Sequence, residues 1–293
     1  MLTNRLSSQA VEETRQRHRD IFAGQRRYLR RIGLMASVML LYYIYFFLQY
    51  GLPWPRLVIG SQQIGHYFLN MLIWHNLASW PFGYYLWQIF ITIAIVLVGT
   101  VTASFIALPL SFLAARNVMA APLLRPIAAL FRHLFDILRG IDMAIWGMVF
   151  VRAMGMGPLA GVMAIIFQDV GLLGKLYAEG HEAVERSPGR GLTAVGANNI
   201  QKYRFGIFTQ SFPTFLALSL YQIESNTRSA AVLGFVGAGG VGLVYAENMR
   251  LWNWDVVMFV TLIMVTIVMI MDKISAILRN KYIIGDELPL YRP

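Results

Sequence analysis

The sequence contains no cysteine and few charged residues. Without cysteine, the chain forms no disulfide, no thiolate metal site and no thiol nucleophile. Charged residues make up only 14% of its 293 residues and hydrophobic residues make up 57%, whereas a soluble domain carries about 25% charged residues. Together with a mean hydropathy of +0.55, this composition predicts an integral membrane protein.

Motifs for nucleotide chemistry and catalysis are also missing. There is no GxxxxGK(S/T) phosphate-binding loop, which excludes an ATP site of that type in this chain. No single segment carries a Ser/His/Asp set or a carboxylate pair. The histidines show no metal-ligand spacing; they are His18, His66, His75, His133 and His181. We therefore expect no enzyme, and no metal or cofactor bound by this chain.

Basic residues outnumber acidic ones by 25 to 15, which gives a net charge of +10. They lie at the N-terminus and at the ends of apolar runs, as in the cytoplasmic loops of inner-membrane proteins, rather than in a nucleic-acid-binding patch. The basic segment 1–31 either lies as an amphipathic helix on anionic headgroups or is a solvated orientation signal. Membrane lipids are expected partners, and nucleic acid is not.

Six apolar runs are candidates to cross a bilayer as helices, which takes about 20 residues each. They cover residues 32–50, part of 83–115, 135–154, 159–178, 211–233 and 255–271. The predicted fold class is therefore an all-α integral membrane protein with about six transmembrane helices.

The loops between these runs set the topology. Lys and Arg in alternate loops place both termini in the cytoplasm. The apolar stretch 64–80 is interrupted by histidines and asparagines, so it is expected to be an interfacial helix on the external side. In the third run, Arg139 and Asp142 are three residues apart and are expected to pair near the cytoplasmic boundary.

A polar cluster interrupts the fifth run at Glu224, Asn226 and Arg228. Ionisable groups at membrane depth rarely face lipid; they pair, line a cavity or mark a transport path. Glu224 and Arg228 share a helix face and can neutralise each other. Either this pair ties helices together, or Arg228 offers its guanidinium to an anionic substrate. Asn226 and, in the fourth run, Asp169 are further candidates for the path.

Glycines follow this cluster directly. Residues 237–242, GAGGVG, match GxGxxG, but a dinucleotide site also requires a preceding strand and a βαβ unit. Between two membrane runs, glycine instead permits positive φ and close backbone approach. We expect a close-packed external gate or turn formed by Gly237, Gly239, Gly240 and Gly242.

The polar segment 179–210 separates the fourth and fifth runs. Ser187-Pro188-Gly189 is typical of a turn between two helices. Beyond it, the small residues Ala194, Gly196 and Ala197 let a partner's backbone approach closely. This protruding helical loop is expected to serve as a docking site.

The loop resembles the coupling loop of ABC-transporter permeases, whose pattern is Glu-Ala-Ala, three residues, Gly, nine residues, Ile-x-Leu-Pro. Gly196 stands at the Gly, whereas 190–192 and 206–209 depart from the two ends of the pattern. Other stretches are more specific: GMGPLAGVMAII (155–166), TAVGANN (193–199) and SLYQIESNTRSAAVLGFVGAGGVG (219–242). From residue 116 to the end of the sixth run, the chain resembles phosphonate-type permeases, which are type I ABC importers.

The resemblance implies a type I ABC importer permease fold and a homodimer of this chain. It also implies two cytoplasmic ATPase subunits that carry ATP and Mg²⁺, and a periplasmic or lipid-anchored substrate-binding protein. The cargo it implies is phosphonate or a related phosphorus oxyanion, such as phosphite, hypophosphite or a phosphate ester. The implied coupling residues are Glu182, Ala194, Gly196, Ala197 and Asn198.

These observations divide the chain into four parts. They are a cytoplasmic basic segment (1–31), a first transmembrane helix with an external interfacial helix (32–82), a permease core (83–280) containing the coupling loop 179–210, and a cytoplasmic tail (281–293). The alternative is a secondary transporter or channel without ATPases. It predicts paired broken helices in two halves and leaves the coupling loop without a function. We favour the permease of an ATP-driven importer in the bacterial inner membrane.

Overall fold

The computed structural model describes residues 19–51, 54–74, 77 and 80–282. The chain divides into two units after Tyr67, and each is described by itself. The secondary structure of the described ranges is helical, which confirms the all-α class. The helices are α2 (Arg19–Tyr50), α3 (Trp54–Leu72), α4 (Phe82–Ala114), α5 (Arg125–Gly140), α6 (Met143–Met154), α7 (Pro158–Ala183), α8 (Ser187–Ala194), α9 (Asn199–Gln201), the π-helical segment η2 (Lys202–Phe208), α10 (Thr209–Phe235), α11 (Val241–Arg250) and α12 (Trp254–Tyr282).

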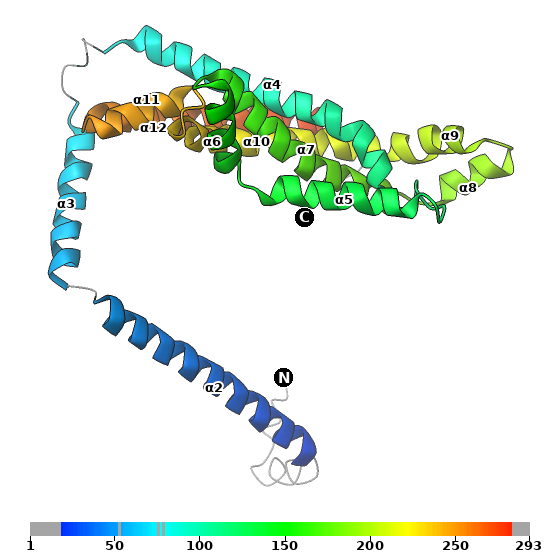
Figure 1. The fold of residues 1–293 in the computed structure, drawn as a ribbon, viewed down its shortest axis with the longest axis horizontal. Helices are drawn as coiled ribbons and strands as arrows, with labels where there is room; N and C mark the ends of the chain where they lie inside the picture. The colour runs from blue at the N-terminus through cyan, green and yellow to red at the C-terminus, as the bar shows by residue number, and fades with distance from the viewer. Residues whose placement is uncertain (1–18, 52–53, 75–76, 78–79, 283–293) are drawn as a thin grey trace, which may run out of the picture. The chain divides into compact units, whose positions relative to one another are not determined.

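The first unit consists of α2 and most of α3 (Figure 1). The side chains of α2 are exposed from Tyr28 onward, and Tyr28–Tyr50 is long and apolar enough to cross a membrane, which agrees with the first predicted span. Residues 1–18 of the predicted basic segment lie outside the described residues, and so does most of the predicted tail, from residue 283 on.

The interfacial helix predicted at 64–80 is misplaced. Helix α3 begins at Trp54 and ends at Leu72. Pro55 lies in its first turn, where the missing proline N–H leaves no hydrogen bond unmade. The polar residues within 66–70 are part of the helix, because polar side chains on an exposed face do not interrupt it.

Four helices in the described part of the chain are long and apolar enough to cross a membrane. In the second unit these are α4, α7 and α12, which correspond to the second, fourth and sixth predicted spans. Helix α10 covers the fifth predicted span and has 27 residues, but it is not apolar enough to belong to this set. Its crossing of the membrane stays a prediction.

The third predicted span, 135–154, is wrong as a single helix, since the chain breaks between α5 and α6. The Asp142 carboxylate caps α6 by accepting a hydrogen bond from the Ala144 N–H at 2.9 Å, an interaction that aspartate favours at helix starts. The predicted Arg139–Asp142 pair is therefore also wrong. Arg139 Nε instead donates to Asp136 Oδ1 at 3.0 Å, three residues back in the same helix.

Helix α7 lies at the centre of the second unit and contacts α4, α5, α6 and α10 (Figure 1). Two residues on its face toward α5, Gly171 and Gly174, are glycines. A Cβ on Gly171 would lie 2.7 Å from the Arg139 backbone N, and a Cβ on Gly174 would lie 2.5 Å from the ring of Phe135. Phe135 is fully buried. Glycine therefore lets the two helices approach to backbone distance.

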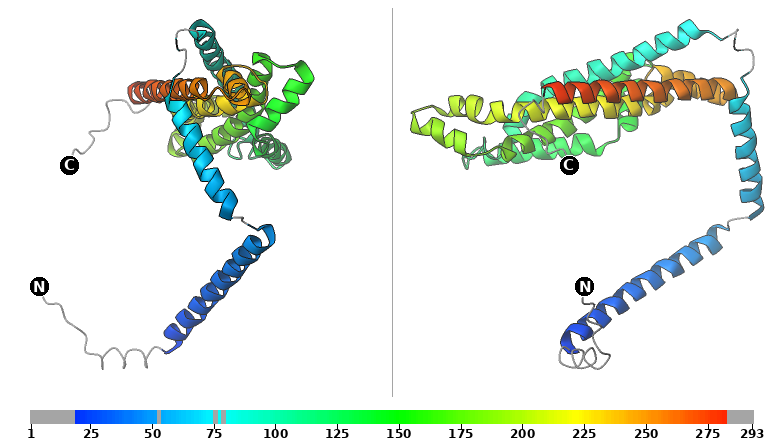
Figure 2. Two further views of the ribbon diagram at one scale, coloured as in Figure 1. Left: turned by 90° about the vertical axis from the view of Figure 1, so that its left-hand side faces the viewer. Right: turned by 180° about the vertical axis from the view of Figure 1, so that it is seen from behind.

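Helix α11 packs on α4, α10 and α12. Figure 2 shows α12 running alongside α10. Val241, Val244 and Val260 are buried between these helices, and the Phe259 ring centroid lies 5.3 Å from that of Trp80. This packing fixes the end of α10 at which the glycine-rich stretch lies.

Residues 184–208, which we call the elbow, contain α8, α9 and η2 and project from the end of the bundle where α5 begins (Figure 1). The turn predicted at 187–189 is misplaced. Ser187-Pro188-Gly189 begins α8, because proline suits the first helical turn. The turn between α8 and α9 lies at Gly196, whose φ is +85°. From α9 the helical path continues through η2 into α10.

The change Gly171→Ala is expected to lower the melting temperature of the purified chain. The added methyl group would meet the α5 backbone, and overpacking of this kind costs about 1–3 kcal/mol. Gly83→Ala is the matched control, because nothing lies within 4 Å of a Cβ at that helical position. Thermal unfolding in detergent measures both. An unchanged melting temperature for Gly171→Ala would contradict the close contact between α5 and α7.

Candidate translocation path and coupling elbow

A network of buried polar side chains joins three helices of the second unit. The Asp169 carboxylate, on α7, accepts hydrogen bonds from Gln222 Nε2 at 2.8 Å and Asn226 Nδ2 at 2.5 Å, both on α10. Asn226 Nδ2 also lies 2.7 Å from Thr100 Oγ1 of α4, which accepts from it. All four side chains are buried. The network therefore provides partners for groups that would be costly to bury alone.

The four predicted path residues fall into two places. Asp169 and Asn226 lie together inside this network. Glu224 and Arg228 form the predicted i,i+4 pair, in which Arg228 Nη2 donates to Glu224 Oε1 at 2.9 Å, with side-chain exposures of 49% for Arg228 and 19% for Glu224. Gln222 was not among the predicted path residues. Its spacing from Asn226 was the available signal, because two amides four residues apart share a helix face.

A pocket of about 400 Å³, which we call the central pocket, lies beside the network and is lined by residues of α6, α7 and α10 together with Asp142. Neither Glu224 nor Arg228 lines it. Its polar lining residues are Asp142, Gln168, Tyr221, Gln222, Ser225, Asn226 and Ser229. Gln168 Oε1 is buried and accepts no hydrogen bond from any residue that the structure describes. Part of the pocket wall thus consists of hydroxyls and amides, which recur on α10 at spacings of three and four.

The predicted glycine gate is a tight turn between α10 and α11. Gly237, Gly239 and Gly240 have φ values of +90°, +83° and +76°, which glycine adopts without strain. The Gly237 carbonyl accepts a hydrogen bond from the Gly157 N–H at 3.1 Å, next to the start of α7. Gly242 lies in α11 rather than in the turn, and its missing side chain lets α11 pack directly on α10. No described strand precedes this turn, so the GxGxxG match forms no dinucleotide site.

Four of the five predicted coupling residues lie at the tip of the elbow. Ala194 ends α8, and Gly196 and Ala197 form the turn that follows. Asn198 caps α9, because its Oδ1 accepts a hydrogen bond from the Gln201 N–H at 2.9 Å. The tip is therefore a defined turn held by a helix cap.

Two large apolar side chains stand exposed beside this turn. Val195 is 80% exposed and Ile200 is 76% exposed. They lie at the end of a projection, away from the four buried core clusters of the described chain. Exposed apolar side chains placed together suit contact with another protein.

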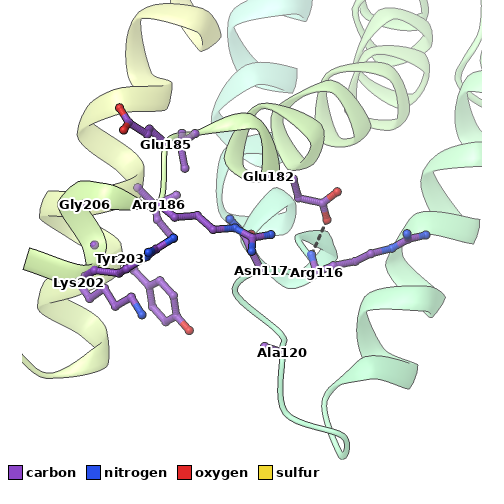
Figure 3. Close-up of a pocket in the computed structure, with 13 residues that line it drawn as sticks. Arg116, Asn117, Ala120, Glu182, Glu185, Arg186, Lys202, Tyr203 and Gly206 are labelled. Atoms are coloured by element: carbon purple, nitrogen blue, oxygen red, sulfur yellow. Dashed lines mark hydrogen bonds between the residues drawn. The ribbon is translucent and has the colours of Figure 1, made fainter. Parts of the chain in front are cut away.

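The fifth predicted coupling residue, Glu182, lies at the base of the elbow instead. Its Oε1 accepts a hydrogen bond from the backbone N–H of Arg116 at 2.6 Å. The same oxygen forms an ion pair with Arg132 Nη2 of α5. Figure 3 shows the Arg116 bond beside a cleft of about 560 Å³, which the elbow residues Arg186 and Lys202 also line. Glu182 therefore connects the end of α7 to α5. The cleft separates this connection from the first residues of the elbow.

His181, one residue earlier, makes a second connection at the same place. Its buried ring lies 3.2 Å from Ser111 Oγ on α4, through Nε2, and 3.2 Å from Ser211 Oγ on α10, through Nδ1. The end of α7 is thus joined to α4 and α10 as well as to α5. The sequence analysis missed this role, because a single histidine carries no motif.

The described chain combines helices of membrane-spanning length, a partly polar pocket lined by α6, α7 and α10, and a projecting elbow, and together these features define a membrane transport subunit. The chain belongs to the family of binding-protein-dependent transport system inner membrane components, whose model matches residues 107–283. It is a permease subunit of an ATP-driven importer and not an enzyme. As such it is a multi-pass protein of the bacterial inner membrane and works with ATPase and substrate-binding partners.

Relatives cover about two thirds of the chain. The phosphite transport system permease protein PtxC of Stutzerimonas stutzeri is 34% identical over 191 residues, which are 65% of this chain and 68% of that protein. The phosphate-import permease protein PhnE of Mycolicibacterium smegmatis is 33% identical over 192 residues, which are 66% of this chain and 36% of that protein. Among solved structures, the MetNI methionine ABC transporter in an inward facing conformation matches with a TM-score of 0.59 at 19% identity, over 69% of this chain and 98% of that chain. This likeness shows the fold alone, and it confirms the predicted type I importer permease fold.

Replacing Asn226 by leucine is expected to destabilise the chain. The leucine has a similar volume but leaves Asp169 Oδ2 and Thr100 Oγ1 without the Asn226 amide donor, and unpaired buried polar groups cost about 1–3 kcal/mol each. Ser225→Ala, one residue earlier on the pocket wall, is the control and is expected to leave the melting temperature unchanged. Equal melting temperatures for Asn226→Leu and the wild type would contradict the network.

Proposed function

We propose that this chain moves phosphonate or a related phosphorus oxyanion, such as phosphite, hypophosphite or a phosphate ester, across the inner membrane by alternating access. The observation that carries the proposal is the match, along about two thirds of this chain, to relatives whose names specify phosphite and phosphate. ATP and Mg²⁺ belong to the partner ATPase subunits. A secondary transporter or channel, the alternative, does not account for membership of a family that depends on binding proteins.

The functional unit we propose is a homodimer with the path between the two copies. Support comes from the outward face of α10, where Tyr221 and Val232 are 53% and 51% exposed. Ser225 and Arg228 share this face, since residues four and seven apart align on a helix. A face that carries a guanidinium at membrane depth suits a water-filled path or another protein better than lipid.

Within this path, Arg228 gives a passing oxyanion a transient guanidinium partner, and Glu224 competes with the anion for it. Guanidinium groups match oxyanions because their N–H donors form a planar fork. The hydroxyls of Ser225 and Ser229 supply further donors from the central pocket. Asp169 and Asn226 hold the pocket wall from behind.

Coupling to ATP hydrolysis runs through the elbow in this proposal. The ATPases dock on the exposed tip around Gly196, and their nucleotide state moves the elbow as a rigid body. Glu182 and His181 pass this motion to α4, α5 and α10. A ligand shifts a two-state equilibrium only if its contacts differ between the states, and here the docked ATPases supply that difference.

The elbow then faces the cytoplasm, and so do both termini. The turn around Gly237, Gly239 and Gly240 lies at the external side, where it serves as a gate near the binding protein. Its backbone contact with Gly157 ties the gate to the start of α7. The same helix therefore reaches from the external gate to the base of the elbow.

The double variant Val195→Glu and Ile200→Glu, which places a charge at both exposed tip positions, is expected to lose its ATPase subunits. Charged groups replace apolar contacts, so co-purification with the ATPases should fall at least about tenfold, the equivalent of 1.4 kcal/mol. Leu251→Glu is the control, because Leu251 is 68% exposed and lies after α11, away from the elbow. Retention of the ATPases by the double variant would contradict docking at the tip.

Arg228→Gln is expected to raise the KM for ATP-driven phosphite uptake about tenfold, because a hydrogen bond to a charged group is worth about 1.5–3 kcal/mol. Glu224→Gln should leave KM unchanged or lower it. Uptake is measured in proteoliposomes that contain the permease, its ATPases and its binding protein. If both variants instead lower the melting temperature alike and leave KM unchanged, the pair is structural. If the wild type imports no phosphorus oxyanion, the proposed function is wrong.

A further inference from the structure

A charged triad joins α5 to α7. Asp136 Oδ1 accepts hydrogen bonds from Lys175 Nζ at 2.6 Å and from Arg139 Nε at 3.0 Å. Both cations therefore share one oxygen of one carboxylate, and the triad carries a net positive charge. The ammonium and the guanidinium each keep N–H donors that this oxygen does not use. All three side chains are partly exposed, at 24% for Lys175, 41% for Asp136 and 42% for Arg139.

The triad lies on the same face of α7 as the central pocket. Lys175 follows Gln168 by seven residues, which is two helical turns along one face. Gln168 lines the central pocket, and so do Leu172 and Leu176 on either side of Lys175. Since α7 runs from the glycine turn to the elbow and Leu176 is the last residue of α7 in the pocket wall, Lys175 lies at the elbow end of the pocket.

The two exposed faces of α5 show where the triad points. One face is apolar, with exposures of 40% to 66% at Ile127, Leu130, Leu134 and Ile137. Another face is charged. It carries Arg125, Arg132, Asp136 and Arg139, whose spacings of seven, four and three align them on one side of the helix. Charged side chains avoid lipid and an apolar face suits it, both within a membrane and at its surface. The triad therefore belongs to the side of α5 that faces water or protein.

We propose that Lys175 and Arg139 form a binding site for the transported oxyanion, on the elbow side of the central pocket. An oxyanion that displaces Asp136 would bond both cations at once, because the shared carboxylate oxygen already holds them within reach of a single acceptor. Asp136 returns when the anion leaves, so it speeds release as well as competing for binding. This inference rests on the proposed import of a phosphorus oxyanion.

A purely structural role for the triad makes a different prediction. If the ion pairs only hold α5 against α7, loss of the carboxylate lowers stability and uptake as much as loss of either cation, because each change breaks an ion pair. If the cations bind cargo, loss of the carboxylate removes a competitor. The two roles therefore predict opposite changes in KM for Asp136→Asn.

The test uses the permease with its ATPases and binding protein in proteoliposomes, with phosphite and methylphosphonate as probes. Lys175→Gln and Arg139→Gln are expected to raise KM about tenfold, since each removes a charge-assisted hydrogen bond. Asp136→Asn is expected to lower KM severalfold. Lys175→Arg should keep most of the affinity, because it keeps the charge. Lys273→Gln is the matched control, an exposed lysine on α12 outside the triad and pocket.

The outcomes separate this inference from the proposed function. Equal losses of melting temperature and uptake in Asp136→Asn and Lys175→Gln would overturn the oxyanion site while leaving the importer intact. If the wild type imports no phosphorus oxyanion, the site is tested by binding alone: millimolar phosphite should raise the melting temperature of the wild-type complex but not of Lys175→Gln. No phosphite-dependent shift in either protein would overturn it.

Discussion

Helix α7 contacts α4, α5, α6 and α10, and two glycines on its face toward α5 let it approach that helix to backbone distance. At Gly171 and Gly174 there is no room for a side chain between α7 and α5. The consequence is that the polar groups of α7 are brought within hydrogen-bond distance of several neighbours. Close packing of this kind leaves few alternative arrangements for the helices that surround α7.

The polar residues of α7 connect it to three neighbouring helices. Asp169 joins α10 through two amides, Lys175 joins α5, and His181 joins α4 and α10. Glu182 ties the last turn to α5 at the base of the elbow. Helix α7 therefore links the base of the elbow to the part of the central pocket that it lines together with α10. The π-helical segment η2 lies beside the cleft at the base of the elbow, and π-helical turns are frequent at functional sites.

Much of the fold could be predicted from local sequence. Composition and run length identified four helices of membrane-spanning length, and the i,i+4 spacing identified the Glu224–Arg228 pair, because both depend on residues close together in the chain. The break before Asp142 was missed. Most residues of 135–154 are apolar, which favoured a single run, although Gly140 and Asp142 are local signals for a helix end and a helix start. The capping bond from the Ala144 N–H to Asp142 shows the break. The position of α3 was missed for a similar reason, since exposed polar residues were given more weight than a proline in the first turn.

The sequence by itself determined the class of protein, its family resemblance, the candidate polar residues and the glycines that need positive φ, because these follow from composition, motif and local backbone rules. Only the tertiary structure decided which of those residues meet. It joined Asp169 to Asn226 over 57 residues and Lys175 to Asp136 over 39, and it placed Glu182 at the base of the elbow, apart from the other predicted coupling residues at the tip. Contacts of that range depend on how whole helices pack, and no pattern within one helix encodes the face that its neighbour will present.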